Sequence, residues 1–162
     1  MASSIKQIAL RTIQLEAQSI SELEAFINDD FEKAVTAIAG CKGRVVVSGI
    51  GKSAVIAQKI VATFNSTGTP SIFMHAADAI HGDLGMVQQE DVVIIISKSG
   101  ESPEIKVLVP LIRNFGNVLI GMVGSIDSFL AKNATLILNT TVQQEACPNN
   151  LAPTTSTTAQ LV

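Results

Sequence analysis

The chain has 162 residues, of which 47% are hydrophobic and only 15% are charged, and its formal net charge is −3 at pH 7. This length predicts one domain with a sizeable core, and the acidic balance argues against nucleic acid or an anionic membrane as a partner. Two cysteines, Cys41 and Cys147, are too few for a metal knuckle or a disulfide framework. Because the charged fraction is well below the usual quarter, we expect a homo-oligomer whose subunits cover part of this surface.

The N-terminal part of the chain predicts two helices, over residues 4–28 and 30–39, the second closed by Gly40. Six apolar residues of the first helix fall on or near one stripe: Ile5, Ala9, Ile13, Ala17, Ile20 and Ile27. A helix-turn-helix DNA reader is the functional alternative, but the pair lacks basic residues on its polar side. No run of about 18 apolar residues and no signal-peptide pattern is present, so we expect a cytoplasmic protein with no membrane partner.

A glycine-rich loop, Ser48-Gly-Ile-Gly-Lys-Ser53, follows the first predicted buried strand at residues 44–47. A Walker A phosphate loop would need a glycine where Val46 stands, so that motif is not satisfied. The loose dinucleotide pattern GxGxxA is satisfied. However, the next strand ends in Met74 and His75 where a ribose-binding acid is wanted, which argues against a nicotinamide cofactor.

Ionisable residues lie close to the ends of these first two strands. Lys52 stands at the mouth of the glycine-rich loop, on the edge where doubly wound sheets bind ligands; the alternative is an ordinary solvated lysine. Both histidines, His75 and His81, fall in segment 75–83 after the strand at 71–74. With the nearby aspartates they could hold a divalent metal. Hydrogen-bonded polar residues lining a cleft are the favoured interpretation, and no metal or cofactor is predicted.

The stretch 91–104 is the centre of the predicted fold. Residues 92–96 are an uninterrupted β-branched run, typical of a strand buried on both faces of a parallel sheet. A hydroxyl-rich loop follows at once, and then Ser102 fits a helix N-cap and Pro103 the first helical position. This arrangement points free N–H groups and a helix dipole at one spot. The stretch is therefore either a phosphate site or an ordinary serine-rich turn.

The remaining elements complete a pattern of alternating strands and helices. The helix after Pro103 carries Pro110, where a kink is expected. Further strands are predicted at 118–123 and 135–138, with a short helix at 128–132 between them. A long polar connection, 140–153, precedes a helix start signal at 154–158, so we expect this chain to be part of a longer protein. The pattern predicts a three-layer α/β/α sandwich with a five-stranded parallel sheet.

Two serine-bearing loops on such a sheet, 49–53 and 97–102, resemble those of a sugar isomerase (SIS) domain. Four further segments are similar to D-arabinose 5-phosphate isomerases: Phe64–Pro70, His81–Met86, Glu145–Pro148 and Leu151–Thr158. The resemblance covers nearly the whole chain. It implies one SIS domain over residues 1–162, with N-terminal helices at 4–39 and an α/β core at 43–162.

The resemblance implies an enzyme that interconverts D-ribulose 5-phosphate and D-arabinose 5-phosphate without a cofactor. Its product would feed 3-deoxy-D-manno-octulosonate synthesis for lipopolysaccharide or capsule. The implied phosphate-binding residues are Ser53, Ser97, Ser99 and Ser102, with Gly51 and His75 also at the substrate. Lys52, Glu104 and Glu145 stand where the family has functional residues, and His81 where it has a histidine lining the site. A non-catalytic sugar-phosphate-binding regulator on the same fold is the alternative.

This chain departs from the family pattern at Lys98, where asparagine is usual, and at Asn149-Asn150, where Leu-Gly is usual. The resemblance also implies a later Ser-His-Pro-Gly-Gly segment with a functional histidine, and paired CBS domains, beyond Val162. We therefore expect the 162-residue chain to hold the site but to lack one residue that the family uses. The family places its sites between subunits, which implies a dimer or tetramer.

Isomerisation through an enediolate needs a base for the carbon proton, an acid/base for the oxygens and a group that stabilises negative charge. Our hypothesis is that Glu104 or Glu145 abstracts the proton and Lys52 polarises the oxygen. Taken without the resemblance, Glu104 is equally explained as a first-turn acid that complements a helix dipole. Glu145 is equally explained as a solvated loop residue.

Overall fold

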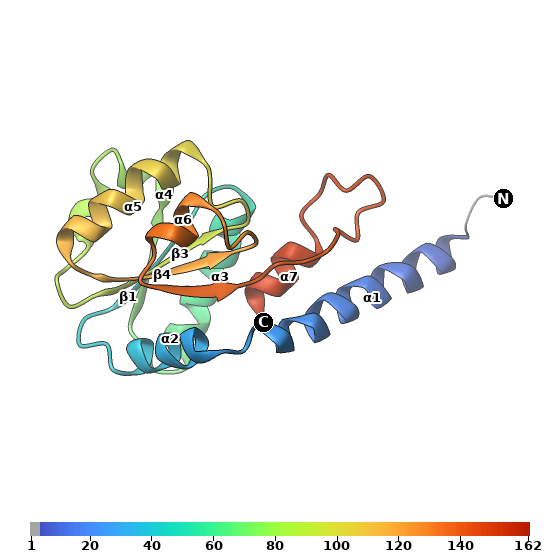
Figure 1. The fold of residues 1–162 in the computed structure, drawn as a ribbon, viewed down its shortest axis with the longest axis horizontal. Coiled ribbons are helices and arrows are strands. Elements are labelled where there is room, and N and C mark those ends of the chain that lie inside the picture. The colour runs from blue at the N-terminus through green and yellow to red at the C-terminus, as the bar shows by residue number, and fades with distance from the viewer. Residues whose placement is uncertain (1–3) are drawn as a thin grey trace.

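A computed structural model describes residues 4–162 and contains one sheet of five parallel strands (Figure 1). The strands lie side by side in the order β2-β1-β3-β4-β5. Their bounds are Val45–Gly49 for β1, Ser71–His75 for β2, Val92–Ser97 for β3, Val118–Val123 for β4 and Leu136–Asn139 for β5. Each predicted strand is present within two residues of its expected bounds, which confirms the predicted parallel sheet.

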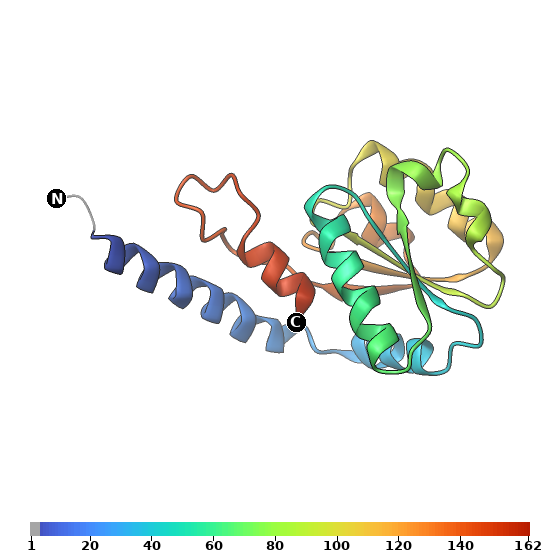
Figure 2. The same ribbon diagram turned by 180° about the vertical axis from the view of Figure 1, so that it is seen from behind.

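Helices cover both faces of the sheet, as the three-layer prediction requires. On one face lie α4 (Ala76–Ala79), α5 (Pro103–Phe115) and α6 (Phe129–Asn133), and on the other lie α2 (Asp29–Ala39) and α3 (Lys52–Ser66) (Figures 1 and 2). All six residues of β3 are buried. Its Val93 and Ile95 pack into the core beneath α5, and Ile94 and Ile96 pack into the core beneath α3.

The predicted N-terminal helix is divided in the structure. Helix α1 spans Ile5–Glu22, and a 3-10 turn, η1, spans Leu23–Phe26. The Asn28 side chain accepts hydrogen bonds from the first N–H groups of α2, so the chain has to leave the first helix before that cap. Helix α1 extends beyond the sheet and contacts α7 (Thr155–Leu161) near the C-terminus (Figures 1 and 2).

The apolar stripe predicted on α1 is largely uncovered in this chain. Ile5 and Ile13 are 88% and 65% exposed, and Ile20 and Ile27 are also exposed. Most helical stability in proteins comes from packing an amphipathic face against other elements. The exposed stripe therefore supplies apolar surface that another chain could cover.

Three further local features differ from the sequence-based expectations or refine them. Segment 75–83 begins with the short helix α4, and a second short helix, η2, spans Asp83–Met86. Helix α5 continues through Pro110 as one element. Ser102 occupies the N-cap position of α5, as predicted, but its hydroxyl makes no capping hydrogen bond. Within residues 4–162, no helix is both long and apolar enough to cross a membrane.

A buried carboxylate fastens the amino-terminal end of the central strands. Asp91 accepts hydrogen bonds from the backbone N–H groups of Arg44, at 2.7 Å, and Gln88, at 2.8 Å. The Arg44 guanidinium lies 3.4 Å from the same carboxylate and donates at 2.7 Å to the Met86 carbonyl oxygen. These contacts tie the start of β1 to the start of β3 across 47 residues of sequence.

We expect Asp91→Ala to lower the free energy of unfolding by about 1–3 kcal/mol, because it leaves buried N–H donors without acceptors. Urea unfolding monitored by circular dichroism measures the change. Glu90→Ala, at the adjacent exposed position, is the matched control and should stay within about 0.5 kcal/mol of the parent. Equal stability of the two variants would contradict the role given to Asp91.

Candidate functional site

The candidate site lies where the sheet order reverses. From β1 the chain crosses to β2 on one side, whereas β3, β4 and β5 follow on the other side. The neighbouring strands β1 and β3 pair in parallel, with Gly49 opposite Ile96, so both end at the same edge. In open α/β sheets this switch point, outside the carboxyl ends of the strands, is where ligands bind.

An open pocket of about 460 Å³ occupies this edge, a size within the usual range for small-molecule sites. It is lined by Ile50, Ser53, Ile96, Ser97, Lys98, Ser99, Ser102, Gly124 and Ser125. The structure thus brings together all four serines that the sequence predicted to bind phosphate. Ser53 is the second residue of α3, whereas the other three run from Ser97, the last residue of β3, to Ser102 at the N-cap of α5.

The four hydroxyls differ in the partners they already have. Ser97 Oγ accepts from the Gly100 N–H at 3.0 Å, and Ser99 Oγ accepts from the Glu101 N–H at 3.3 Å. Each can still donate its own hydrogen to a ligand. Ser102 Oγ is buried and has no hydrogen-bond partner among the described residues. An unpaired buried hydroxyl is costly, so this atom is poised to bond an incoming polar group.

The loop after β3 can adopt its shape only because residue 100 is glycine. Gly100 has φ 65°, and a Cβ there would collide with the side chain of Ser128, at the start of α6. A larger residue would therefore push this loop away from α6. On the neighbouring loop, Gly51 has φ 59° and occupies the N-cap position of α3.

Lys52 and Glu104 stand at the starts of the two helices that flank the pocket. Lys52 is the first residue of α3 and is exposed. Glu104 is in the first turn of α5 and half-buried. Because α3 and α5 follow β1 and β3, both residues lie at the same sheet edge as Ser99. Within residues 4–162, the Glu104 carboxylate has no ion-pair or hydrogen-bond partner.

Glu145 is buried and bound on both carboxylate oxygens. Its Oε1 lies 2.6 Å from the Lys98 ammonium, and the side chains of these residues are 2% and 52% exposed, respectively. Its Oε2 accepts from Thr154 N at 2.7 Å, Thr154 Oγ1 at 3.0 Å, Thr155 Oγ1 at 3.1 Å and Ser156 N at 3.2 Å. The carboxylate therefore fastens the loop after β5 to the first turn of α7. The alternative of a solvated loop residue is wrong.

The surroundings of Glu145 strongly favour its charged form. Burial by itself raises the pKa of the carboxyl, but hydrogen bonds from Lys98, Ser156 and Thr154 outweigh that effect. The net result is a pKa well below its ordinary value. A carboxylate held in this state is a weak proton acceptor until a donor is withdrawn.

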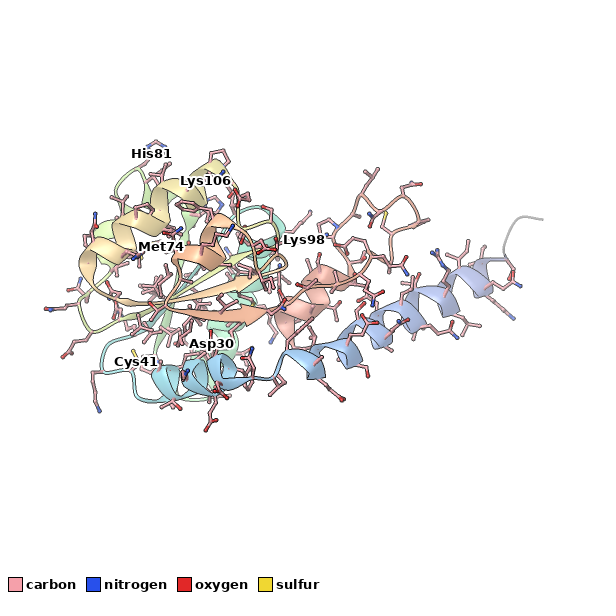
Figure 3. The ribbon with its side chains drawn as sticks, viewed as in Figure 1. Asp30, Cys41, Met74, His81, Lys98 and Lys106 are labelled. Carbon is pink, nitrogen blue, oxygen red and sulfur yellow. The ribbon has the colours of Figure 1, made fainter. Side chains whose placement is uncertain are left out.

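Of the two histidines, His75 lies on the pocket edge of the sheet and His81 lies away from the pocket. His75 ends β2 opposite Gly49 of β1, so it lies on the pocket edge of the sheet, and its Nδ1 is 3.8 Å from Asp78 Oδ2. His81 is exposed in the turn after α4, and Figure 3 shows it far from Lys98. A single chain therefore does not bring His81 to the pocket.

Two contacts at the site were missed by sequence reasoning. Gln160, which is buried in α7, accepts a hydrogen bond from Ser53 Oγ at 3.3 Å. Gly124 and Ser125, after β4, also line the pocket. Gln160 stands in a helix that is already rich in hydroxyl residues, so its sequence context gave no signal of this contact. For Gly124 and Ser125, the signal was their place at the end of a predicted strand.

The fold and pocket define a doubly wound α/β domain with a hydroxyl-lined ligand site at its switch point. A family model described as the SIS domain matches residues 37–162. The chain therefore belongs to the SIS domain family, as the sequence resemblance predicted.

Several relatives are similar over almost the whole chain. Arabinose 5-phosphate isomerase KdsD of Pseudomonas aeruginosa is 53% identical over 95% of this chain and 47% of its own length. KdsD of Escherichia coli is 48% identical over 97% of this chain and 48% of its own length. A solved E. coli structure, in complex with arabinose 5-phosphate, is 40% identical with a TM-score of 0.91 and covers 99% of this chain and 86% of that one. The chain spans about half the length of the two KdsD enzymes.

The low pKa of Glu145 predicts an acid-dependent loss of stability. Because the unfolded carboxyl has an ordinary value near 4.5, its contribution is complete above that pH and disappears as pH falls towards the lower folded value. Glu145→Gln should cost about 1–3 kcal/mol at pH 7, and the difference from the parent should shrink below pH 4.5. Urea midpoints measured from pH 7 to pH 3 test this, and a difference independent of pH would contradict it.

Proposed function

We propose that the complete protein is an aldose–ketose isomerase that interconverts D-ribulose 5-phosphate and D-arabinose 5-phosphate. The observation that carries the proposal is the meeting of Ser53, Ser97, Ser99 and Ser102 in one pocket. Hydroxyls at the N-terminal ends of two helices suit a phosphate dianion. The names of the KdsD relatives and the arabinose 5-phosphate bound to a 40% identical structure support this choice of substrate.

The proposed chemistry is proton transfer between the first two sugar carbons through an enediolate, and it uses no cofactor. Lys52 stabilises the oxygen that becomes negative, since a cation at a pocket mouth acts more strongly than it does in bulk water. Of the two carboxylates, Glu104 is better suited to be the base. It carries no ion-pair partner within residues 4–162, whereas Glu145 is held as an anion by several donors.

The product would be consumed in making 3-deoxy-D-manno-octulosonate for lipopolysaccharide or capsule. We place the reaction in the cytoplasm, because a phosphorylated sugar is too polar to cross a bilayer readily. Both free cysteines, Cys41 and Cys147, fit a reducing compartment. The net charge of −3 supports a protein that does not bind nucleic acid.

The working form is proposed to be a homo-oligomer, a dimer or tetramer. Two features support association: the uncovered apolar stripe of α1, and further exposed apolar side chains at Val55 and Leu151. We also propose that His81, which lies far from Lys98 in its own chain (Figure 3), serves the pocket of a second copy.

A deuterium-exchange assay on the full-length protein tests the proposed reaction. Incubated with D-arabinose 5-phosphate in D₂O, the enzyme should incorporate deuterium at the second carbon, as detected by proton NMR. Glu104→Gln and Lys52→Met should each lower kcat by about 10²-fold or more, the scale of one positioned acid–base or electrostatic group. Glu90→Gln, an exposed acid just before β3 at the opposite edge of the sheet, is the matched control. Binding of the sugar phosphate without any exchange would indicate a sensor instead of an enzyme.

Replacing one apolar residue of the α1 stripe should weaken association. Ile13→Ser removes a large exposed apolar side chain, and its neighbour Gln14→Ser is the control that leaves the stripe intact. Sedimentation velocity at micromolar concentrations should show the parent and the control as oligomers and a larger fraction of smaller species for Ile13→Ser. A monomeric parent protein would refute the proposed assembly.

A further inference from the structure

The ion pair between Lys98 and Glu145 joins two parts of the site that are 47 residues apart in sequence. Lys98 lies between Ser97 and Ser99 and lines the pocket, whereas Glu145 belongs to the loop after β5. The ammonium is half exposed, and Figure 3 shows Lys98 at the side of the body that faces this loop and α7. Lys98 is therefore the one cation that lines the serine pocket within residues 4–162, and it is already paired with a carboxylate.

The two oxygens of Glu145 are held in different ways. Oε2 accepts hydrogen bonds from Thr154, Thr155 and Ser156, so the position of the carboxylate is fixed without Lys98. Oε1 has Lys98 as its hydrogen-bond partner among the described residues. The ammonium can therefore leave Glu145 without releasing the loop from α7.

A phosphate bound by the four serines would compete for this ammonium. A dianion in the pocket carries more charge than the carboxylate, and the flexible stem of a lysine allows its charged head to move between neighbouring anions. Apart from Lys98, the polar side chains that line this pocket and could hold the phosphate are neutral hydroxyls.

We propose that Lys98 is a shared counterion, paired with Glu145 in the free protein and transferred to the phosphate of the bound ligand, so that ligand binding exposes Glu145 Oε1 to the sugar. The inference rests on the proposed function, since it assumes that a phosphorylated ligand enters this pocket. In the bound state Lys98 contacts the phosphate directly, and by leaving Glu145 it also changes the state of that carboxylate.

Transfer of the ammonium changes what Glu145 can do. With Lys98 withdrawn, one of the hydrogen bonds that lower the pKa of Glu145 is lost, and the carboxyl becomes a better proton acceptor. Glu145 is thus a weak proton acceptor while the pocket is empty and a stronger one once the substrate phosphate is bound. In this arrangement Glu104 and Glu145 have different states before binding and can share proton transfer after it.

A double-mutant cycle with inorganic phosphate as the probe tests the transfer. Phosphate binding to the full-length protein is measured by isothermal titration calorimetry for the parent, Lys98→Met, Glu145→Gln and the double variant. Lys98→Met should weaken binding by about fivefold, because a cation is lost, and Glu145→Gln should strengthen it by about two- to fivefold, because the ammonium is released. In the Lys98→Met background, Glu145→Gln should have little effect.

The matched control is Lys33→Met, which removes an ammonium 3.9 Å from Asp30 in a pair on α2, away from the pocket, and should leave phosphate affinity unchanged. If Lys98→Met does not fold, Lys98→Gln gives the same test, since it keeps a donor for Glu145 and removes the charge. If Glu145→Gln changes phosphate affinity equally in the parent and in Lys98→Met, Glu145 simply repels the anion and the transfer is overturned. A phosphate affinity of Lys98→Met that is no lower than that of the control would also overturn it.

These outcomes separate the counterion proposal from the proposed function. If neither inorganic phosphate nor D-arabinose 5-phosphate binds the parent protein, the phosphate pocket itself is wrong and both proposals fall. If phosphate binds but the cycle is additive, the pocket stands and only the transfer of Lys98 is overturned.

Discussion

The parallel pairing of β1 with β3 is the constraint on which the rest of the site depends. It sets Gly49 beside Ile96, so the loops that follow these strands open at one edge of the sheet. Buried Asp91 holds the opposite ends of the same two strands together through Arg44. Because the strands are fixed at both ends, hydroxyls from two distant segments meet in one pocket, and the described residues contain neither a cluster of metal-ligating side chains nor a disulfide.

The buried carboxylate of Glu145 organises a second part of the structure, the loop after β5 and helix α7. It accepts hydrogen bonds from the first turn of α7, which fixes a long polar loop that otherwise has little regular structure. Gln160, at the other end of α7, contacts Ser53 at the pocket. The C-terminal helix is thus connected to the ligand site at two points. Since α1 also contacts α7, the exposed N-terminal helix lies next to a segment that is joined to the pocket.

The elements that sequence reasoning predicted best are those whose signals are local. The β-branched run at 92–96 and the N-cap and proline at 102–103 each specify their own structure, and the strand order then places the serines together. The Lys98–Glu145 and Ser53–Gln160 contacts could not be predicted, because they join residues 47 and 107 positions apart. The stripe on α1 predicted a helix, but it carried no information on which chain covers it.

The central claim is that one pocket between the ends of β1 and β3 receives the phosphate of a sugar phosphate. A crystal structure of the full-length protein with D-arabinose 5-phosphate tests it most directly. We expect phosphate density within hydrogen-bonding distance of Ser97, Ser99 and Ser102, with the sugar extending towards Lys52 and Glu104. Phosphate density at any other place on the sheet, with this pocket empty, would contradict the claim.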